Sequence, residues 1–147
     1  MENFETRKSW MSLLAKAPAE RLAALWANCD APEYDVLRPP EIGGVMVRGR
    51  AGGTGAPFNL GEMTVTRCSL ALRDGGTIGH GYVQGRAPEK ATQAALIDAL
   101  MQTEAAEGLR TTLLRPLAED MAKAKQERAN KAAATKVDFF TMVRGED

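Results

Sequence analysis

Apolar residues recur at helical spacing in two short segments near the start of the chain. The first segment, residues 6–17, carries an i, i+3, i+4, i+7 stripe made of Trp10, Met11, Leu13, Leu14 and Ala17. After Pro18 a second stripe follows, made of Leu22, Ala23, Leu25 and Trp26. The pattern predicts an N-terminal helical hairpin that buries both tryptophans.

The middle of the chain alternates between apolar and polar residues, as β-strands do. Strands are predicted over residues 34–38, 44–50, 62–73 and 77–84, and Pro39-Pro40 is expected to end the first of them. Asp74-Gly75-Gly76 is a strong hairpin signal between the last two strands. Within 62–73 the apolar phase changes, which a bulge near Arg67 would reconcile. We therefore expect an antiparallel sheet built on residues 34–84.

The strand predicted at 77–84 has one bare face, because Gly79 and Gly81 alternate with larger residues. A helix or a partner is expected to lie close against this face. The next segment, 88–102, begins with Pro88 and is rich in alanine, which predicts a helix suited to that close packing.

Asp98 lies inside the apolar run of this helix, between Ile97 and Ala99. A carboxylate in such a position is expected to be desolvated and to need a cation or a hydrogen-bond donor. The candidates for the cation are the sheet-region arginines Arg50, Arg67 and Arg86.

The C-terminal third changes character after Gly108. Residues 109–114 predict a short apolar helical piece, and 117–135 predict a long helix rich in Ala, Lys and Glu, whose apolar stripe is thin. An abrupt apolar tail, residues 137–143, follows it. We expect residues 117–147 to bind a partner, with Phe139, Phe140 and Met142 as interface residues.

Composition limits the functional classes. The chain has 147 residues, with 44% apolar and 26% charged residues, which fits a single globular domain, residues 1–147. The predicted helices and antiparallel sheet place this domain in the α+β class. Lys plus Arg and Asp plus Glu both number 19, so the charge balance does not suggest nucleic acid or a membrane surface as a partner. The absence of a leader-like start and of a long apolar run predicts a cytoplasmic protein.

The motifs do not make a self-sufficient catalytic set. The loop Arg50-Ala-Gly-Gly-Thr-Gly55 is not followed by Lys-Ser or Lys-Thr, so an inter-strand connection is favoured over a phosphate loop. One histidine and two distant cysteines do not supply an ordinary metal site, and His80 is more typical of a packed strand residue than of a general base. Four arginines form either an anion-binding cluster or a solvated or interface row: Arg48, Arg50, Arg67 and Arg86.

Several longer stretches resemble one family. They are Arg7-Lys-Ser-Trp-Met-Ser-Leu-Leu14, Arg50-Ala-Gly-Gly-Thr-Gly55, Gly61-Glu-Met-Thr-Val-Thr-Arg67, Tyr82-Val-Gln-Gly-Arg86, Ala95-Leu-Ile-Asp-Ala-Leu-Met-Gln102 and Lys136-Val-Asp-Phe-Phe-Thr-Met-Val-Arg-Gly145. Together they are similar to the PhnG family, a small subunit of the bacterial phosphonate carbon–phosphorus lyase core complex, and the similarity covers nearly the whole chain.

The resemblance implies a complex with three larger partners of the PhnH, PhnI and PhnJ families, two copies of each. It also implies a part in making α-D-ribose 1-methylphosphonate 5-triphosphate from ATP and an alkylphosphonate, with release of adenine. The resemblance further implies that ATP and Mg²⁺ are bound as substrates by the complex as a whole, and that another subunit carries an iron–sulfur cluster and S-adenosylmethionine. This chain is expected to bind no cofactor itself, and its two cysteines are too few to hold such a cluster.

Two hypotheses follow from the residues and the resemblance together. In the first, the chain is an accessory subunit of the transferase and lyase complex, with no catalytic residue and no metal ligand of its own. In the second, it contributes phosphonate- or ATP-contacting residues to a shared active site, and the candidates are Arg50, Thr54, Arg67 and Arg86. The direction in which the arginines point distinguishes the two.

Overall fold

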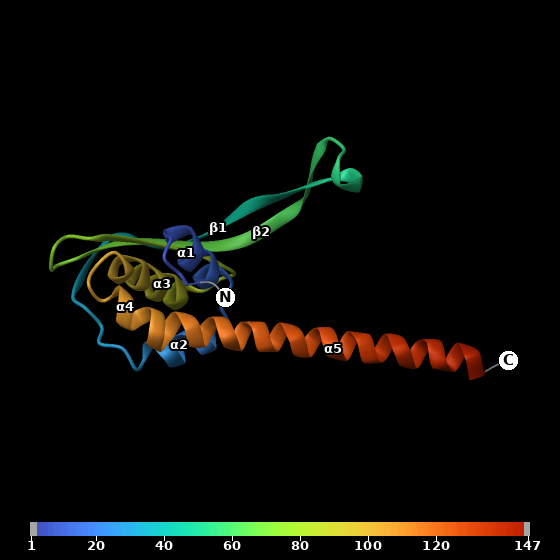
Figure 1. The fold of residues 1–147 in the computed structure, drawn as a ribbon. Helices are drawn as coiled ribbons and strands as arrows, with labels where there is room; N and C mark the ends of the chain where they lie inside the picture. The colour runs from blue at the N-terminus through green and yellow to red at the C-terminus, as the bar shows by residue number, and fades with distance from the viewer. Residues whose placement is uncertain (1–2, 146–147) are drawn as a thin grey trace.

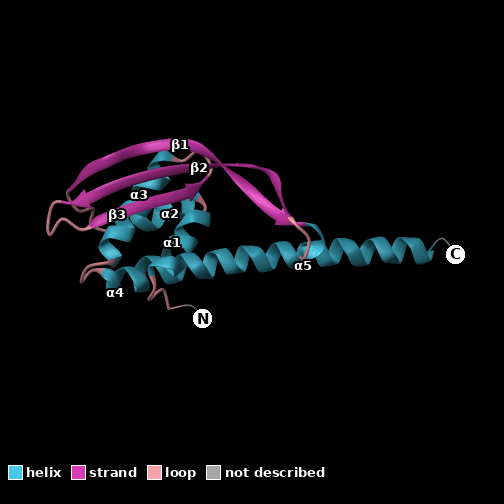
Figure 2. Ribbon diagram, turned by 90° about the horizontal axis from the view of Figure 1, so that it is seen from above, coloured by secondary structure: helices cyan, strands magenta, loops and turns pink. Residues whose placement is uncertain are grey.

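A three-stranded antiparallel sheet, with helices packed against one face, forms the body of the molecule (Figures 1 and 2). The computed structural model describes residues 3–145, although the side chains of Ala51, Asn59 and residues 137–145 lie outside the described part. The elements are α1 (Arg7–Lys16), α2 (Ala19–Trp26), β1 (Tyr34–Arg50), η1 (Ala51–Gly53), β2 (Pro57–Leu72), β3 (Ile78–Gln84), α3 (Pro88–Met101), α4 (Ala106–Leu109), η2 (Arg110–Leu114) and α5 (Arg115–Gly145). The predicted α+β class is confirmed.

Helix α3 packs directly on β3 because the strand offers a glycine face to it. Residues of β3 alternate strictly between exposed and buried, with Gly79, Gly81 and Val83 buried. A methyl group on Gly79 would collide with the carbonyl oxygen of Ala95, and one on Gly81 with the carbonyl oxygen of Ala91. The predicted close approach of a helix to this face is therefore confirmed.

The hydrophobic core lies between the sheet and the helices. Helix α3 is buried along most of its length, and α1, α2, β2, η2 and the first turn of α5 contribute Leu14, Leu22, Leu70, Leu113 and Leu117. Of the two tryptophans that were expected in the core, Trp10 is buried, whereas Trp26 is only partly buried. The reason is that α2 lies at the margin, where it contacts α3 and α5.

Strand β1 does not end at Pro39-Pro40, as the sequence had suggested, but continues to Arg50. It is an edge strand, and the prolines lie where its register with β2 shifts, between Arg38 and Glu41. At such a place a missing N–H breaks no ladder hydrogen bond. The bulge that was expected near Arg67, within the strand 62–73, is not found there. The extra residue lies in β1, between Arg38 and Glu41, and β2 pairs with β3 in unbroken register.

Beyond the end of β3, strands β1 and β2 continue as a two-stranded arm. The last residue pair of β2 with β3 is Val65 with Gln84, whereas β1 and β2 stay paired as far as Arg50 with Pro57. We refer to residues 44–64 as the arm. It bends away from the body and ends in the glycine-rich loop (Figure 1). That loop therefore joins two strands, as predicted.

Helix α5 is longer than expected. The apolar segment 137–143 does not follow the helix as a separate tail, because α5 continues to Gly145. No proline or glycine stands between Pro116 and Gly145, so nothing in the sequence stops the helix earlier. A π-helical segment, η2, precedes α5 and accommodates Pro116, which has no N–H for a regular helical bond.

Most of α5 extends beyond the body (Figures 1 and 2). Between Ala122 and Lys136 every side chain except that of Ala124 is exposed. Among the described residues no helix is both long enough and apolar enough to cross a membrane.

Candidate functional site

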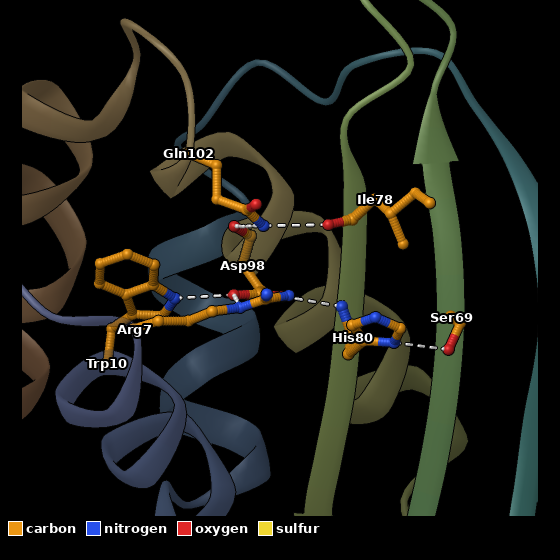
Figure 3. A network of polar contacts seen from close by, with 7 residues as sticks. All are labelled: Arg7, Trp10, Ser69, Ile78, His80, Asp98 and Gln102. Atoms are coloured by element: carbon orange, nitrogen blue, oxygen red, sulfur yellow. Dashed lines mark hydrogen bonds and ion pairs between the residues drawn. The ribbon is translucent and has the colours of Figure 1, made fainter.

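The carboxylate of Asp98 is the centre of a buried polar network (Figure 3). Asp98 is completely buried, and its main cation is Arg7, at the start of α1. The guanidinium donates from Nε to Oδ1 at 3.0 Å and from Nη2 to Oδ2 at 2.7 Å. This two-point contact matches the planar shapes of both groups. The hydrogen bonding that Arg7 donates to Asp98 raises the pKa of Arg7, whereas desolvation by burial acts in the opposite direction.

Two more donors complete the network around Asp98. The indole Nε1 of Trp10 donates at 2.9 Å, and the backbone N–H of His80 donates at 2.8 Å. The expected pairing with Arg50, Arg67 or Arg86 is therefore wrong. Arg7 takes their place because α1 packs against both β3 and α3, which brings the first residue of α1 next to the carboxylate.

The same network closes the free edge of β3. One turn after Asp98, the side chain of Gln102 donates to the carbonyl oxygen of Ile78 at 2.9 Å. Asp98 and Gln102 thus satisfy backbone groups of residues 78 and 80 that no further strand pairs. Unpaired edges invite unwanted strand association. The role of Asp98 is therefore to lock α1, α3 and β3 together.

A second polar cluster lies on the opposite face of the sheet, which no helix covers. Here the Ser69 hydroxyl and His80 Nδ1 are 2.9 Å apart. They line a shallow pocket of about 500 Å³ together with Leu37, Arg38, Arg67 and Tyr82. The side chain of His80 thus points to this face, while its backbone N–H serves the Asp98 network (Figure 3).

The residues that were expected to contact an anion are not brought together. Arg50 and Thr54 lie at the tip of the arm, Arg67 lies in the middle of β2, and Arg86 lies between β3 and α3. Along β2 the partner of Arg50, Pro57, is ten residues from Arg67, which corresponds to roughly 30 Å of strand. Of the four, only Arg67 lines the pocket on the open face of the sheet.

A groove of about 680 Å³ separates α1 from the first turns of α5. Its apolar lining comes from Phe4, Leu13 and Met121, and Lys8 and Lys16 lie at its margin. Among the described residues no three His, Cys, Asp or Glu side chains are grouped so that they could hold a metal ion.

Comparison with known proteins identifies the family. The family model described as "Phosphonate metabolism protein PhnG" matches residues 5–145. The chain is also 45% identical over 142 residues to the alpha-D-ribose 1-methylphosphonate 5-triphosphate synthase subunit PhnG of Rhizobium meliloti (strain 1021). That alignment covers 96% of this chain and 90% of the relative. The chain belongs to the PhnG family.

The stretches through which the chain resembles the PhnG family now have positions in the fold. The first contains Arg7 and Trp10, and the stretch 95–102 contains Asp98 and Gln102, so these two stretches meet in the buried network. Arg7 and Trp10 are three residues apart on one face of a helix, which is the signal in the sequence that pointed to a shared partner. Trp10 was predicted only to pack in the core, and neither residue was predicted to contact Asp98, because these contacts join residues 91 and 88 positions apart.

The last such stretch of the PhnG family, residues 136–145, lies at the end of α5. The side chains of the expected interface residues Phe139, Phe140 and Met142 lie outside the described residues. Their part in an interface therefore stays a prediction.

Proposed function

We propose that this chain is an accessory subunit of a phosphonate-processing synthase complex and that it holds larger partners by two projections, the arm and α5. The proposal rests above all on one observation, which is that both projections extend from the same side of the body (Figures 1 and 2). Together they give the molecule the shape of a fork, with exposed surface along both prongs.

The arm has the composition of an interface rather than of a free ribbon. Its exposed apolar side chains are Met46, Val47, Phe58 and Leu60, with exposed fractions of 55%, 37%, 46% and 62%. A two-stranded ribbon is marginally stable in water on its own. A partner that covers these side chains would stabilise the arm by removing apolar surface from water.

Helix α5 supports the same conclusion. An isolated polar helix gains little stability from its own side chains, since most helical stability comes from packing of one face. Here the exposed stretch 122–136 leads to an apolar end, residues 137–143 in the sequence. We propose that this end is seated on another subunit.

The chemistry of the complex is proposed from the relative. Its name describes a subunit of a synthase of alpha-D-ribose 1-methylphosphonate 5-triphosphate. We extend this to the present chain, as a subunit needed for the transfer of an alkylphosphonate to the ribose C1 of ATP with release of adenine. The proposed partners belong to the PhnH, PhnI and PhnJ families, and the complex is proposed to be cytoplasmic, with Mg²⁺, the iron–sulfur cluster and S-adenosylmethionine bound elsewhere in the assembly.

Co-expression with the three partners tests the docking proposal. We expect that deletion of the residues after Lys136, and separately the double substitution Phe58→Asp with Leu60→Asp, abolish co-purification while the circular dichroism of the body persists. The matched control is Ala24→Asp on α2, which also places a carboxylate at an exposed apolar position, but on the body and not on the arm or α5. Retention of the complex by both interface variants would overturn the proposal.

The alternative is that the chain contributes residues to a shared active site, with Arg50, Thr54, Arg67 and Arg86 as the candidates. For Arg67, this alternative is supported by the position of the residue in an open pocket. In the assembled complex, Arg67→Gln would then lower adenine release without affecting co-purification. An unchanged rate of adenine release would contradict this alternative for Arg67 and support the accessory role.

A further inference from the structure

We infer that the pocket on the open face of the sheet binds a tetrahedral oxyanion of the phosphate and phosphonate class. The site comprises Arg38, Arg67, Ser69, His80 and Tyr82. The inference rests on the proposed function only for the biological source of the anion, because binding itself is a property of this chain.

The sheet register places the binding groups in two neighbouring rows. Ser69 pairs with Arg38 on β1 and with His80 on β3, so these three residues form one row across the sheet. Arg67, two positions earlier in β2 and on the same face, pairs with Tyr82 in the next row. Directly paired residues have their Cβ atoms about 5 Å apart, so long guanidinium side chains from both rows can converge on one small anion.

The irregularities of β1 support a built site. The register of β1 shifts on both sides of Arg38, first between Val36 and Arg38 and again between Arg38 and Glu41. Bulges of this kind redirect a side chain and are common next to binding sites. Here they surround the one β1 residue that supplies a guanidinium to the pocket.

The charge of the pocket is uncompensated. Arg7, Arg21, Arg73 and Arg110 all pair with carboxylates, whereas neither Arg38 nor Arg67 takes part in any ion pair among the described residues. No carboxylate lines the pocket. Glu41 is the register partner of Arg67, yet it forms no ion pair in this part of the structure. Guanidinium groups bind phosphate-like oxygens through paired hydrogen bonds, which suits two unpaired arginines facing one pocket.

The contact between Ser69 and His80 fixes the orientation of the His80 imidazole ring. The Ser69 hydroxyl engages Nδ1 of the ring, and no hydrogen bond among the described residues uses Nε2. The ring is therefore held in one orientation with a nitrogen left for a ligand. Tyr82, two positions after His80 on the same face of β3, adds a phenol group in the neighbouring row. The pocket is shallow, and its lining combines these polar groups with the apolar side chain of Leu37.

A direct test uses the single histidine of the chain as a reporter. The imidazole C–H signals of His80 in the full-length chain are followed by NMR at fixed pH while inorganic phosphate or methylphosphonate is added. We expect a saturable shift of the His80 signals with either anion. The anion that binds more tightly, phosphate or methylphosphonate, indicates which of the two classes the pocket binds in the cell. Because a charge-assisted hydrogen bond contributes about 1.5–3 kcal/mol, Arg67→Gln and Arg38→Gln should each weaken binding roughly tenfold or more.

Two further variants make the test specific. Arg73→Gln removes an exposed arginine that lies outside the pocket and pairs with Asp35, so it should leave anion binding unchanged. Glu41→Gln removes the nearest carboxylate in the register and should strengthen binding. Absence of a saturable shift, or equal binding by Arg67→Gln and the parent chain, overturns the inference. Loss of all anion binding when the partners are added also overturns it, because the face would then be a protein interface. The titrations of the chain alone do not depend on whether the arm and α5 hold the partners.

Discussion

Asp98 receives four hydrogen bonds from three residues on two elements, α1 and β3, while it is itself completely excluded from solvent. We predict that Asp98→Ala lowers the free energy of unfolding by about 2–4 kcal/mol, because the donors of Trp10 and His80 lose their acceptor and Arg7 loses its counter-charge. Urea unfolding measures the loss.

Asp120→Ala is the matched control for this prediction. Its carboxylate pairs with Arg21, but both side chains are nearly half exposed, and exposed pairs contribute about 0–1 kcal/mol. Equal stability losses in the two variants would show that burial of the Asp98 network does not stabilise the fold as described.

Lys90 offers a second test at the residue scale. It is 5% exposed, and its ammonium group donates to the carbonyl oxygen of Ala15 at 3.1 Å. Desolvation lowers the pKa of Lys90 from its ordinary value of 10.5. Between this lowered pKa and pH 10.5, the unfolded chain therefore binds more protons than the folded chain. Stability should therefore rise as the pH increases through the lowered pKa towards 10.5.

Lys90→Met should remove this contribution to the alkaline rise in stability, whereas Lys123→Met, at an exposed position of α5, should retain it. The measurement is urea unfolding of the parent and both variants at a series of alkaline pH values. An identical pH dependence in the parent chain and in Lys90→Met would contradict the assignment to Lys90.

At the scale of elements, the close packing of α3 on β3 is the feature most sensitive to a single methyl group. Gly81→Ala would place its Cβ against the carbonyl oxygen of Ala91, and overpacking of this kind costs about 1–3 kcal/mol. Gly43→Ala is the control, since nothing lies within 4 Å of a Cβ built there. A melting temperature of Gly81→Ala as high as that of Gly43→Ala would mean that the helix and strand are not in close contact.

Some features of the fold could be predicted from local sequence patterns, and others could not. The bare face of β3 and the Asp74-Gly75-Gly76 turn are encoded in adjacent residues, so both could be predicted from the sequence. The passage of β1 through Pro39-Pro40 could not, because it depends on β1 being an edge strand. The length of α5 was underestimated because a change from polar to apolar residues was taken as a boundary, although helices end at backbone signals.

For the functional residues, too, the sequence predicted local features but not contacts that depend on the packing of distant elements. The sequence indicated that Asp98 is buried and needs a cation, and both features are confirmed. The identity of that cation, Arg7, depends on how distant elements pack. Arg67 was selected from the sequence, but its companions in the pocket, Arg38, Ser69 and His80, are assembled only by the register of three strands.

At the scale of the whole molecule, the structure is a small body with two long projections, whose surfaces are completed, in our proposal, by partner subunits. An accessory subunit of this kind need not carry out the reaction. Adenine displacement from ATP requires a nucleotide pocket and groups that stabilise the leaving base, and the sequence contains no phosphate-loop motif. In our proposal, a larger subunit builds the active site, and the arginines and the arm of this chain at most complete it.

The most direct measurement is adenine release from ATP and methylphosphonate, followed by chromatography, first with the highly purified chain alone and then with its partners added. The account predicts no turnover by the chain alone, turnover when the partners are present, and loss of that turnover when catalytic residues of the partner are substituted. Adenine release by the single chain would contradict the accessory role.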